Sequence, residues 1–317
     1  LANYVEAVGF EKAQGQVAGV WARDHLTGQR FLIRSRAVLN ATGPWADAVG
    51  RLAGDVSEPL LQPTKGVHLI VPDQGHRFAY LLLHPDDSRV FFVIPWLGKT
   101  LIGTTDTFPE TGADSLQVTA DEVTYLLQGY NRYLAPPLAP HDVLGTFAGL
   151  RPLIRARPGE PSSLSREFRL HVSPSGLVTA LGGKFTTFRQ MAETIVDLLD
   201  TRLGQRRRCR TRELRLAGAP SQPWSSFERE GLARLRSEFD LPIDCAAHLL
   251  QRHGEVAFTV AERIARTPAG FARAHPEEPD LLGEEAYARE AEMAVHPADV
   301  WLRRTRVGLW RPQLLNR

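Results

Sequence analysis

Residues 181–189 read LGGKFTTFR, where a short apolar strand signal meets two glycines, a lysine and two threonines. Apolar residues at helical spacing follow at once, so the segment predicts a strand that turns sharply into a helix. The first turn of a helix has unpaired N–H groups and a partial positive charge, which favour an anion or a polarised ring. Lys184 adds a full positive charge there. The alternative is a helix capped by Thr186 or Thr187, with a solvated lysine and no ligand.

The helix predicted after this turn has an apolar stripe along one face. Because residues three and four apart share a helical face, we interpret the stripe as part of the core and not as a cofactor site. Its members are Phe188, Met191, Ala192, Ile195, Val196, Leu199 and Leu203.

The composition is that of a globular protein. The chain has 317 residues, 43% of them hydrophobic, enough for a sizeable core in one large domain or two compact ones. Its two cysteines argue against a disulfide framework and suit a reducing cytoplasm. No apolar run approaches the length of a membrane-spanning helix. We interpret an arginine cluster over residues 206–212 as a solvated linker, with a phospholipid or nucleic-acid contact as the alternative.

The N-terminal part predicts strands at residues 5–8, 17–21 and 31–39, separated by glycine-containing turns. The last of these runs ends in NATGPW, residues 40–45. A buried strand that runs into a small glycine-containing turn lets the backbone approach a ligand closely. The alternative is a tight strand-to-helix turn with no ligand.

The middle of the chain predicts an antiparallel sheet followed by a helix. Strands are expected at residues 67–71, 79–83, 90–94 and 100–104, with a hairpin turn at 97–99. Thr119 and Glu122 predict a capping box at the start of a helix over residues 119–134, which Pro136-Pro137 ends.

A second group of strands leads to the opening segment. A glycine-rich strand is expected at residues 145–154, and a hairpin pairs 168–172 with 177–181. Beyond about residue 206 the strand signals disappear, and we place a domain boundary within residues 205–223.

Four basic side chains stand in strand-like segments that a mixed sheet could bring together. The guanidinium fork of arginine suits carboxylate or phosphate, so together they predict an anion pocket. Taken singly, each is better explained by a surface salt bridge worth at most about 1 kcal/mol. The four are Lys65, His68, Arg151 and Arg166.

Several other chemistries lack their motifs. The sequence has no GxSxG nucleophile elbow, no Walker loop and no GxGxxG dinucleotide fingerprint. The ten histidines show no metal-ligand spacing, and there is no CxxC, so no metal site is expected.

Taken together, the motifs resemble the FAD-dependent (aerobic-type) glycerol-3-phosphate dehydrogenases in order and spacing, over nearly the whole chain. The motifs that carry the resemblance are VLNATGPWAD, PTKGVHLIVP, VFFVIPWLGKTLIGTTDT, GLRPL, LSREF, GGKFTTFRQMAE and, in the helical part, EAYAREAEMAVHPADVWLRRTRVGLW.

The resemblance implies oxidation of sn-glycerol 3-phosphate at C2 to dihydroxyacetone phosphate, with hydride passing to the flavin of FAD and electrons onward to a membrane quinone. It implies substrate-side positions at Arg151, Arg166, Lys184, His68 and Thr105. Arg151 is also expected to act in catalysis. Either His68 or Lys184 could take or stabilise the proton of the C2 hydroxyl, and the sequence leaves this open.

The same resemblance implies two cofactor segments. The turn of Ala41, Thr42 and Gly43 would pass the FAD. The isoalloxazine edge would lie against the opening segment, that is Gly182, Gly183, Lys184, Phe185, Thr186 and Thr187. The helix dipole there would favour negative charge on the reduced flavin.

The implied fold class is α+β / α/β, in three parts. A partial FAD-binding (glutathione-reductase-like) domain is expected over residues 1–60 and 145–204, an antiparallel-sheet substrate domain over 61–144, and a C-terminal helical domain over 205–317. The resemblance also implies a cytoplasmic protein, peripheral on the inner face of the plasma membrane, with no nucleic-acid partner; a homodimer is left open.

The sequence departs from the family at its beginning, because the strand–GxGxxG–helix unit that holds the ADP part of FAD is absent. We therefore expect a fragment of the parent enzyme that is inactive in isolation. Two alternatives stay open: a related FAD-dependent amine or amino-acid oxidase, and a catalytically silent interaction domain.

Overall fold

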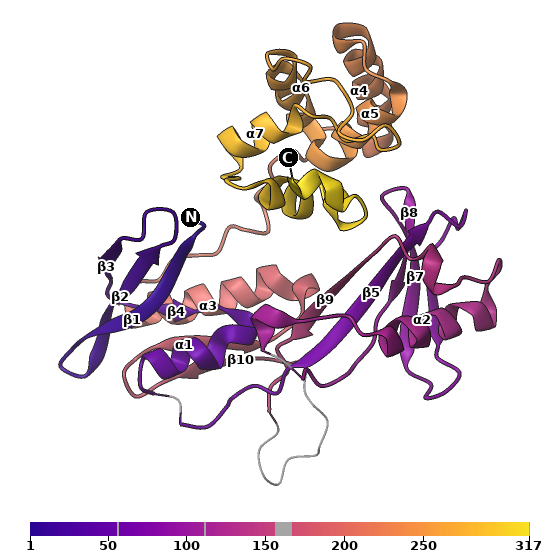
Figure 1. The fold of residues 1–317 in the computed structure, drawn as a ribbon. Helices are drawn as coiled ribbons and strands as arrows, with labels where there is room; N and C mark the ends of the chain where they lie inside the picture. Colours follow the sequence, from indigo (N-terminus) through magenta and orange to yellow (C-terminus); the bar gives the residue numbers. More distant parts are fainter. Residues whose placement is uncertain (56, 111, 156–166, 317) are drawn as a thin grey trace. The chain divides into compact units, whose positions relative to one another are not determined.

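The computed structural model describes residues 1–55, 57–110, 112–155 and 167–316 (Figure 1). Contacts between residues divide the chain into two compact units, Leu1–Thr211 and Arg212–Arg317. The first unit contains the named strands and the second is helical.

A small antiparallel sheet opens the first unit. It consists of β1 (Val5–Ala13), β2 (Gln16–Asp24) and β3 (Arg30–Arg34). The prediction of one continuous strand over residues 31–39 is wrong, because β3 ends at Arg34 and β4 (Leu39–Asn40) belongs to another sheet. Between them the Ser35 hydroxyl donates to the carbonyl of Ala37 and accepts from its N–H, which turns the backbone.

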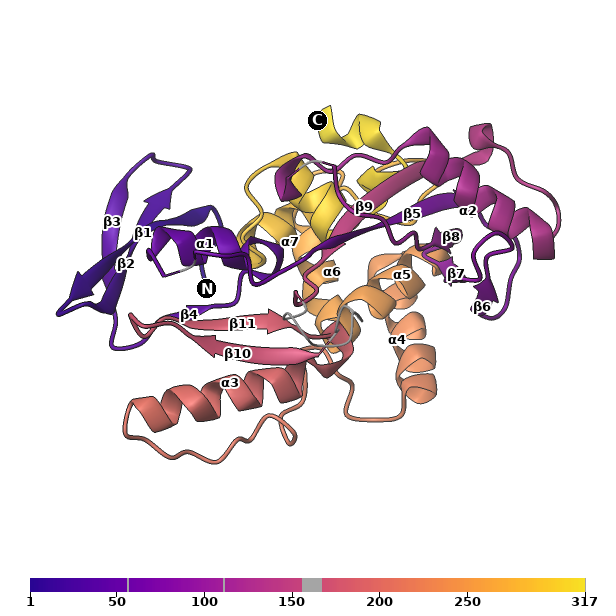
Figure 2. The same ribbon diagram turned by 90° about the horizontal axis from the view of Figure 1, so that it is seen from below.

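The second sheet has the order β10-β11-β4 (Figure 2). β10 (Phe168–Val172) and β11 (Val178–Gly182) form the predicted antiparallel hairpin. β4 pairs with β11 in parallel, with Asn40 opposite Thr179. The segments that follow β4 and β11 therefore leave the sheet at the same end, where both strands have their carboxyl termini.

The third sheet is the predicted antiparallel one, with the strand order β6-β7-β8-β5-β9. Helix α2 (Ala120–Tyr133) covers one face, where its Leu126, Leu127 and Tyr130 pack against the sheet in a shared core. The predicted capping box of Thr119 and Glu122 is confirmed. The strands are β5 (Thr64–Pro72), β6 (Tyr80–Leu83), β7 (Val90–Trp96), β8 (Lys99–Gly103) and β9 (Gly145–Arg151).

The two chain segments that connect the second and third sheets are fixed to each other. Leu61 and Ile154 form an isolated β-bridge and share a core with Leu181 of β11 and Ala46 of α1 (Ala46–Leu52). The Asp47 carboxylate accepts hydrogen bonds from the N–H groups of residues 60 and 61. The start of β5 and the end of β9 are thereby held next to the end of β11.

Helix α3 (Phe188–Arg202) follows the opening segment as predicted, but its apolar stripe is not a continuous core surface. Of the stripe, Ile195 is buried, whereas the Phe188 and Val196 side chains are 53% and 52% exposed. The interpretation of the stripe as core is therefore wrong for those two positions and for Ala192, which is also exposed. Helical spacing predicts that residues share a face, not that another element covers it.

The second unit consists of short helices around a core of its own. Its α-helices are α4 (Trp224–Phe239), α5 (Ile243–His253), α6 (Ala257–Ala265) and α7 (Glu284–Ala291), followed by a π-helix at Asp299–Arg304. Leu235, Leu249 and Ile264 are among its fully buried residues. In the described part of the chain, no helix is both long and apolar enough to span a bilayer.

Short 3₁₀ turns connect the regular elements of both units. They lie at Gly43–Trp45, Ala113–Ser115, Pro140–Asp142, Phe185–Thr187, Gly254–Val256, Val307–Leu309 and Pro312–Asn316.

Candidate active site

His68 lies in the middle of β5 with a neighbour on each side. Its ring stacks on Phe147 of β9, with ring centroids 5.0 Å apart and planes 9° from parallel. On the other side, a Cβ added to Gly103 of β8 would lie 2.3 Å from the His68 Cδ2, so only glycine leaves room for the ring. Burial, and then the nearby Arg151 guanidinium, lower the pKa of His68 to about 4. The imidazole is therefore neutral at pH 7.

Arg151 ends β9 and lies across the backbone of β5. A Cβ added to Gly66 would come within 2.5 Å of the Arg151 Nη2. Nη1 donates to Asp106 Oδ1 at 3.0 Å and to the Lys65 carbonyl at 3.2 Å. Nη2 donates to Thr104 Oγ1 at 2.9 Å and to the Thr105 carbonyl at 3.0 Å. The guanidinium is thus held in one orientation on the strand that carries His68.

Two other predicted residues of this sheet have structural partners. Thr105 is buried, and its hydroxyl accepts a hydrogen bond from the Val67 N–H at 3.1 Å. Lys65 is also buried, and its Nζ forms a 2.9 Å ion pair with Glu122 and donates to the Gln117 carbonyl at 3.0 Å. The hypothesis that Lys65 belongs to an anion pocket is wrong, because its charge is used to attach β5 to α2.

The glycines of the opening segment are needed for packing. Gly182 and Gly183 have φ values of +66° and +91°, in the left-handed region that favours glycine. A Cβ at Gly182 would lie 2.1 Å from the Glu167 carbonyl oxygen, and one at Gly183 would lie 2.3 Å from the Met191 Cε. Their first role is therefore to let the turn pack against its protein neighbours.

The helix start after these glycines carries no side-chain cap. The 3₁₀ turn Phe185–Thr187 leads into α3, and neither element has a capping side-chain hydrogen bond. The Thr187 hydroxyl instead donates to the Lys184 carbonyl at 3.0 Å. Lys184, Thr186 and Thr187 are exposed, and the Phe185 side chain is 89% exposed. The alternative of a helix capped by these threonines is thus wrong, and the first-turn N–H groups have no side-chain cap to compete with a ligand.

The Asn40 side chain fixes the conformation of the turn formed by Ala41, Thr42 and Gly43. The buried Asn40 side chain donates to the Ala46 carbonyl at 2.9 Å and accepts from the N–H and hydroxyl of Thr42. Gly43 has a positive φ of +57°. This exposed turn therefore has a defined shape.

The structure brings the predicted residues together in two groups. The turn after β4 and the helix start after β11 lie at the same end of the second sheet. His68 and Arg151 lie on strands of the third sheet, and Thr105 lies just after one. Bare backbone, a helix N-terminus and a cation at the carboxyl ends of parallel strands suit a ligand with a flat ring and an anionic part. Arg166 lies outside the described residues.

Sequence reasoning missed the residues that shape these sites. Thr104 and Asp106 contact Arg151, Phe147 supports His68, and Gly66 and Gly103 leave room for both side chains. The TTD run after a predicted strand was the available signal for the first two. The others depend on strand register, which residue types alone do not specify.

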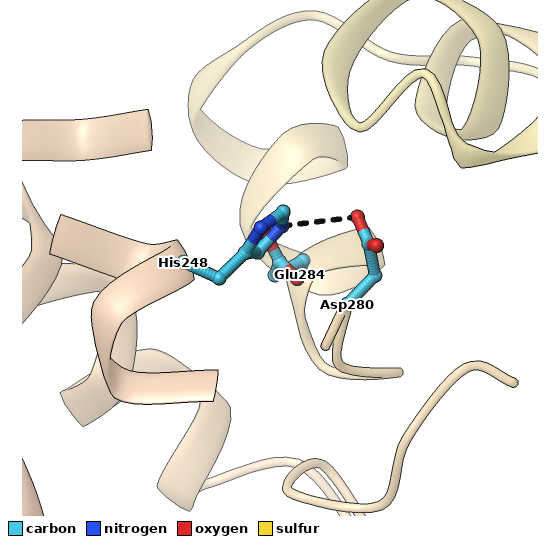
Figure 3. A group of neighbouring side chains, drawn as sticks. All are labelled: His248, Asp280 and Glu284. Carbon is cyan, nitrogen blue, oxygen red and sulfur yellow. Dashed lines mark hydrogen bonds and ion pairs between the residues drawn. The ribbon is translucent and has the colours of Figure 1, made fainter. Parts of the chain in front are cut away.

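A second cluster of titratable groups lies in the helical unit. Figure 3 shows His248 beside Asp280, with 3.2 Å between Nε2 and Oδ1, and Glu284 close by. One ligand atom from each of the three residues lies within 4.8 Å of those of the other two, a spacing that could hold a metal ion. Arg252, however, already pairs with both carboxylates, at 2.9 Å to Asp280 and 2.5 Å to Glu284. The cluster is better described as a buried ion-pair network that connects α5 to the start of α7.

Comparison with known proteins identifies the class. The model of the family described as FAD dependent oxidoreductase matches residues 1–198, and that of the C-terminal domain of alpha-glycerophosphate oxidase matches residues 209–316. The chain therefore belongs to the FAD dependent oxidoreductase family. These matches confirm the predicted family, its cofactor class and the fold class of an FAD-binding domain with sheet and helical parts.

Individual relatives agree. The chain is 32% identical to the aerobic glycerol-3-phosphate dehydrogenase of Bacillus subtilis, over 96% of this chain and 56% of that protein. It is 37% identical to a probable mitochondrial glycerol-3-phosphate dehydrogenase of Caenorhabditis elegans, over 96% of this chain and 43% of that one. The chain thus spans about half the length of the curated relatives that it matches.

A solved structure is also similar. The glycerol-3-phosphate dehydrogenase of Bacillus halodurans complexed with FAD superimposes with a TM-score of 0.86 at 32% identity, over 99% of this chain and 62% of that one.

Proposed function

We propose that the chain supplies the substrate side and part of the FAD site of a flavin-dependent dehydrogenase that converts sn-glycerol 3-phosphate to dihydroxyacetone phosphate. The observation that carries the proposal is the parallel pairing of β4 with β11, because it brings two segments that are far apart in sequence to one end of the sheet. Open α/β sheets bind cofactors at the carboxyl ends of such strands. The named relatives support glycerol 3-phosphate as the substrate.

This end of the sheet would hold the cofactor. FAD, when bound, supplies the acceptor for the hydride that leaves C2 of the substrate. Ala41, Thr42 and Gly43 would pass along it on one side, and Gly182 to Thr187 would face its ring on the other. The first-turn N–H groups of the helix start stabilise negative charge that develops near them.

His68 is our candidate for the group that accepts the C2 hydroxyl proton. Its imidazole is neutral at pH 7 and so has a nitrogen lone pair to offer, although a pKa of about 4 makes it a weak base. A phosphate dianion beside Arg151 would offset more of the guanidinium charge than the Asp106 carboxylate already does, and would so raise the pKa of His68. Substrate binding would then make His68 a stronger base.

The phosphate of the substrate requires fixed cations, and Arg151 and Lys184 supply two. Arg151 is rigidly oriented on the third sheet, while Lys184 stands exposed at the helix start. Arg166 is proposed as a third. Thr105, whose hydroxyl already has a backbone partner, would act by holding β5 and the Arg151 contacts in place.

The electron acceptor and cellular site are proposed from the family resemblance. Electrons would pass to a membrane quinone, and the parent enzyme would lie on the inner face of the plasma membrane as a peripheral protein.

A turnover assay tests the proposal. Because the isolated chain is expected to be inactive, it is joined to a strand–GxGxxG–helix segment, soaked with FAD and given an artificial electron acceptor together with glycerol 3-phosphate, glycerol or glycine. We expect dihydroxyacetone phosphate from glycerol 3-phosphate alone, and a loss of about a hundredfold or more in kcat for His68→Gln. His141→Gln, which changes an exposed histidine outside both groups, is the matched control. Oxidation of glycine in place of glycerol 3-phosphate would assign the chain to the amino-acid oxidases.

A further inference from the structure

The two terminal nitrogens of Arg151 are fully engaged. Each carries two N–H bonds, and each donates to two protein acceptors. An anionic ligand that binds these nitrogens must therefore replace at least one existing partner.

The four acceptors differ in how easily they could be replaced. Two are backbone carbonyls, of Lys65 and Thr105, and a third is the hydroxyl of Thr104 in the chain segment directly after β8. The fourth is the Asp106 carboxylate, which is charged and whose side chain is 42% exposed. Asp106 also has the same chemistry as an incoming anion, because it presents carboxylate oxygens to the guanidinium.

A cavity next to Asp106 offers its side chain a second position. The cavity has a volume of about 310 Å³, and among the described residues that line it Arg89 is the one cation, beside the carboxylates of Asp87, Asp106, Asp121 and Glu122. Arg89 Nη1 already donates to the Asp106 carbonyl at 2.6 Å, so a second guanidinium stands beside this residue. A carboxylate that leaves Arg151 would keep a cation within reach.

We propose that Asp106 is an internal competitor that occupies Arg151 until the anionic group of the substrate replaces it. The inference rests on the proposed function, because it takes Arg151 as the residue that receives that group. Every anion that binds Arg151 must then displace Asp106, and this lowers the apparent affinity of the site for each of them. A carboxylate ligand gains little from the exchange, whereas a phosphate dianion presents more charge to the guanidinium than Asp106 does.

The expected effect follows from the strength of the pair. Both side chains are partly exposed, and ion pairs of that kind contribute up to about 1 kcal/mol, or about fivefold in a binding constant. A competing internal partner lowers the apparent affinity for every ligand by the same factor. Removing the competitor should therefore tighten binding about two- to fivefold.

Calorimetric titration of the full chain with inorganic phosphate and with glycerol 3-phosphate tests this. Asp106→Asn, which keeps the shape and loses the charge, should bind both ligands about two- to fivefold more tightly than the wild type. Asp114→Asn is the control, because Asp114 is an exposed carboxylate that does not line this cavity. Its affinities should not change. Thermal unfolding of each variant verifies that it is folded.

The other outcomes overturn the inference. Weaker binding by Asp106→Asn would mean that Asp106 only holds Arg151 in place, and unchanged binding would mean that no exchange occurs. Absence of phosphate binding to wild type and variant alike would also exclude it. Phosphate binding needs neither FAD nor turnover, so the result is separate from the proposed function: tighter binding without oxidation of glycerol 3-phosphate would reject the function and keep the exchange.

Discussion

The neutral state of His68 makes the stability of the first unit depend on pH in a defined direction. In the unfolded chain a histidine has a pKa of 6.5, and in the folded chain that of His68 is about 4. Between these values the unfolded chain binds the proton and the folded chain does not, so stability falls as the pH is lowered. The difference corresponds to roughly 3 kcal/mol as an upper limit, at about 1.4 kcal/mol for each pKa unit.

The comparison that isolates this contribution is between the wild type and His68→Gln. Urea unfolding of the first unit at several pH values should give a difference between the two proteins that is constant above pH 6.5 and shrinks toward pH 4. The wild type should lose up to about 3 kcal/mol more than the variant on acidification. His141→Gln serves as the control and should follow the wild type.

Nuclear magnetic resonance of the His68 ring measures the same pKa directly. A value close to 6.5, or equal acid sensitivity in wild type and His68→Gln, would refute the account of a buried ring beside a fixed guanidinium.

Three further predictions concern the framework around the sites. Lys65→Ala should lower the free energy of unfolding by about 3–5 kcal/mol, because it leaves the buried Glu122 carboxylate without its cation; a loss below about 1 kcal/mol would mean that the pair is solvated. Gly183→Ala should cost at least about 1–2 kcal/mol in chemical unfolding, from its positive φ alone, and an unchanged midpoint would contradict the packing described for the turn. Arg252→Ala should destabilise the helical unit by about 3–5 kcal/mol at neutral pH. Burial raises the pKa of Glu284, but Arg252 helps to lower it from 4.5 to about 2. The stabilisation by Arg252 should therefore be present above pH 4.5 and fade as the pH falls toward 2. Equal acid sensitivity of wild type and variant in circular dichroism would argue against this coupling.

Local sequence signals predicted the elements with local causes. The capping box at Thr119 and Glu122 specified where α2 begins, and short apolar runs predicted strands of the third sheet. A two-residue turn before Lys99 specified the hairpin. Each of these depends on neighbours within a few residues, which a single sequence displays.

Long-range partners explain what the sequence did not specify. Lys65 looked like a member of an anion pocket, yet its partner Glu122 lies 57 residues away on α2. Phe188 and Val196 had the spacing of core residues, but spacing does not tell whether another element covers them. The run at 31–39 was apolar enough for one strand, and a serine turn within it divided the run between two sheets.

The same distinction between local signals and long-range partners applies to the candidate active site. Residue types and motifs predicted His68, Arg151 and the glycine-rich helix start as candidates. The contacts that define their states come from Phe147, Gly66 and Asp106, through strand pairing and close packing. A sequence suggests which groups could do chemistry, whereas their protonation and orientation depend on residues distant in the chain.

The most direct test of the central claim is the visible absorption spectrum of the chain joined to a strand–GxGxxG–helix segment and soaked with FAD, recorded anaerobically before and after addition of glycerol 3-phosphate. We expect a protein-bound flavin band that bleaches with glycerol 3-phosphate and does not respond to glycine. A bound flavin band that ignores glycerol 3-phosphate and bleaches with an amino acid would contradict the substrate assignment. Failure to retain any flavin would contradict the proposal that the shared end of β4 and β11 holds the cofactor.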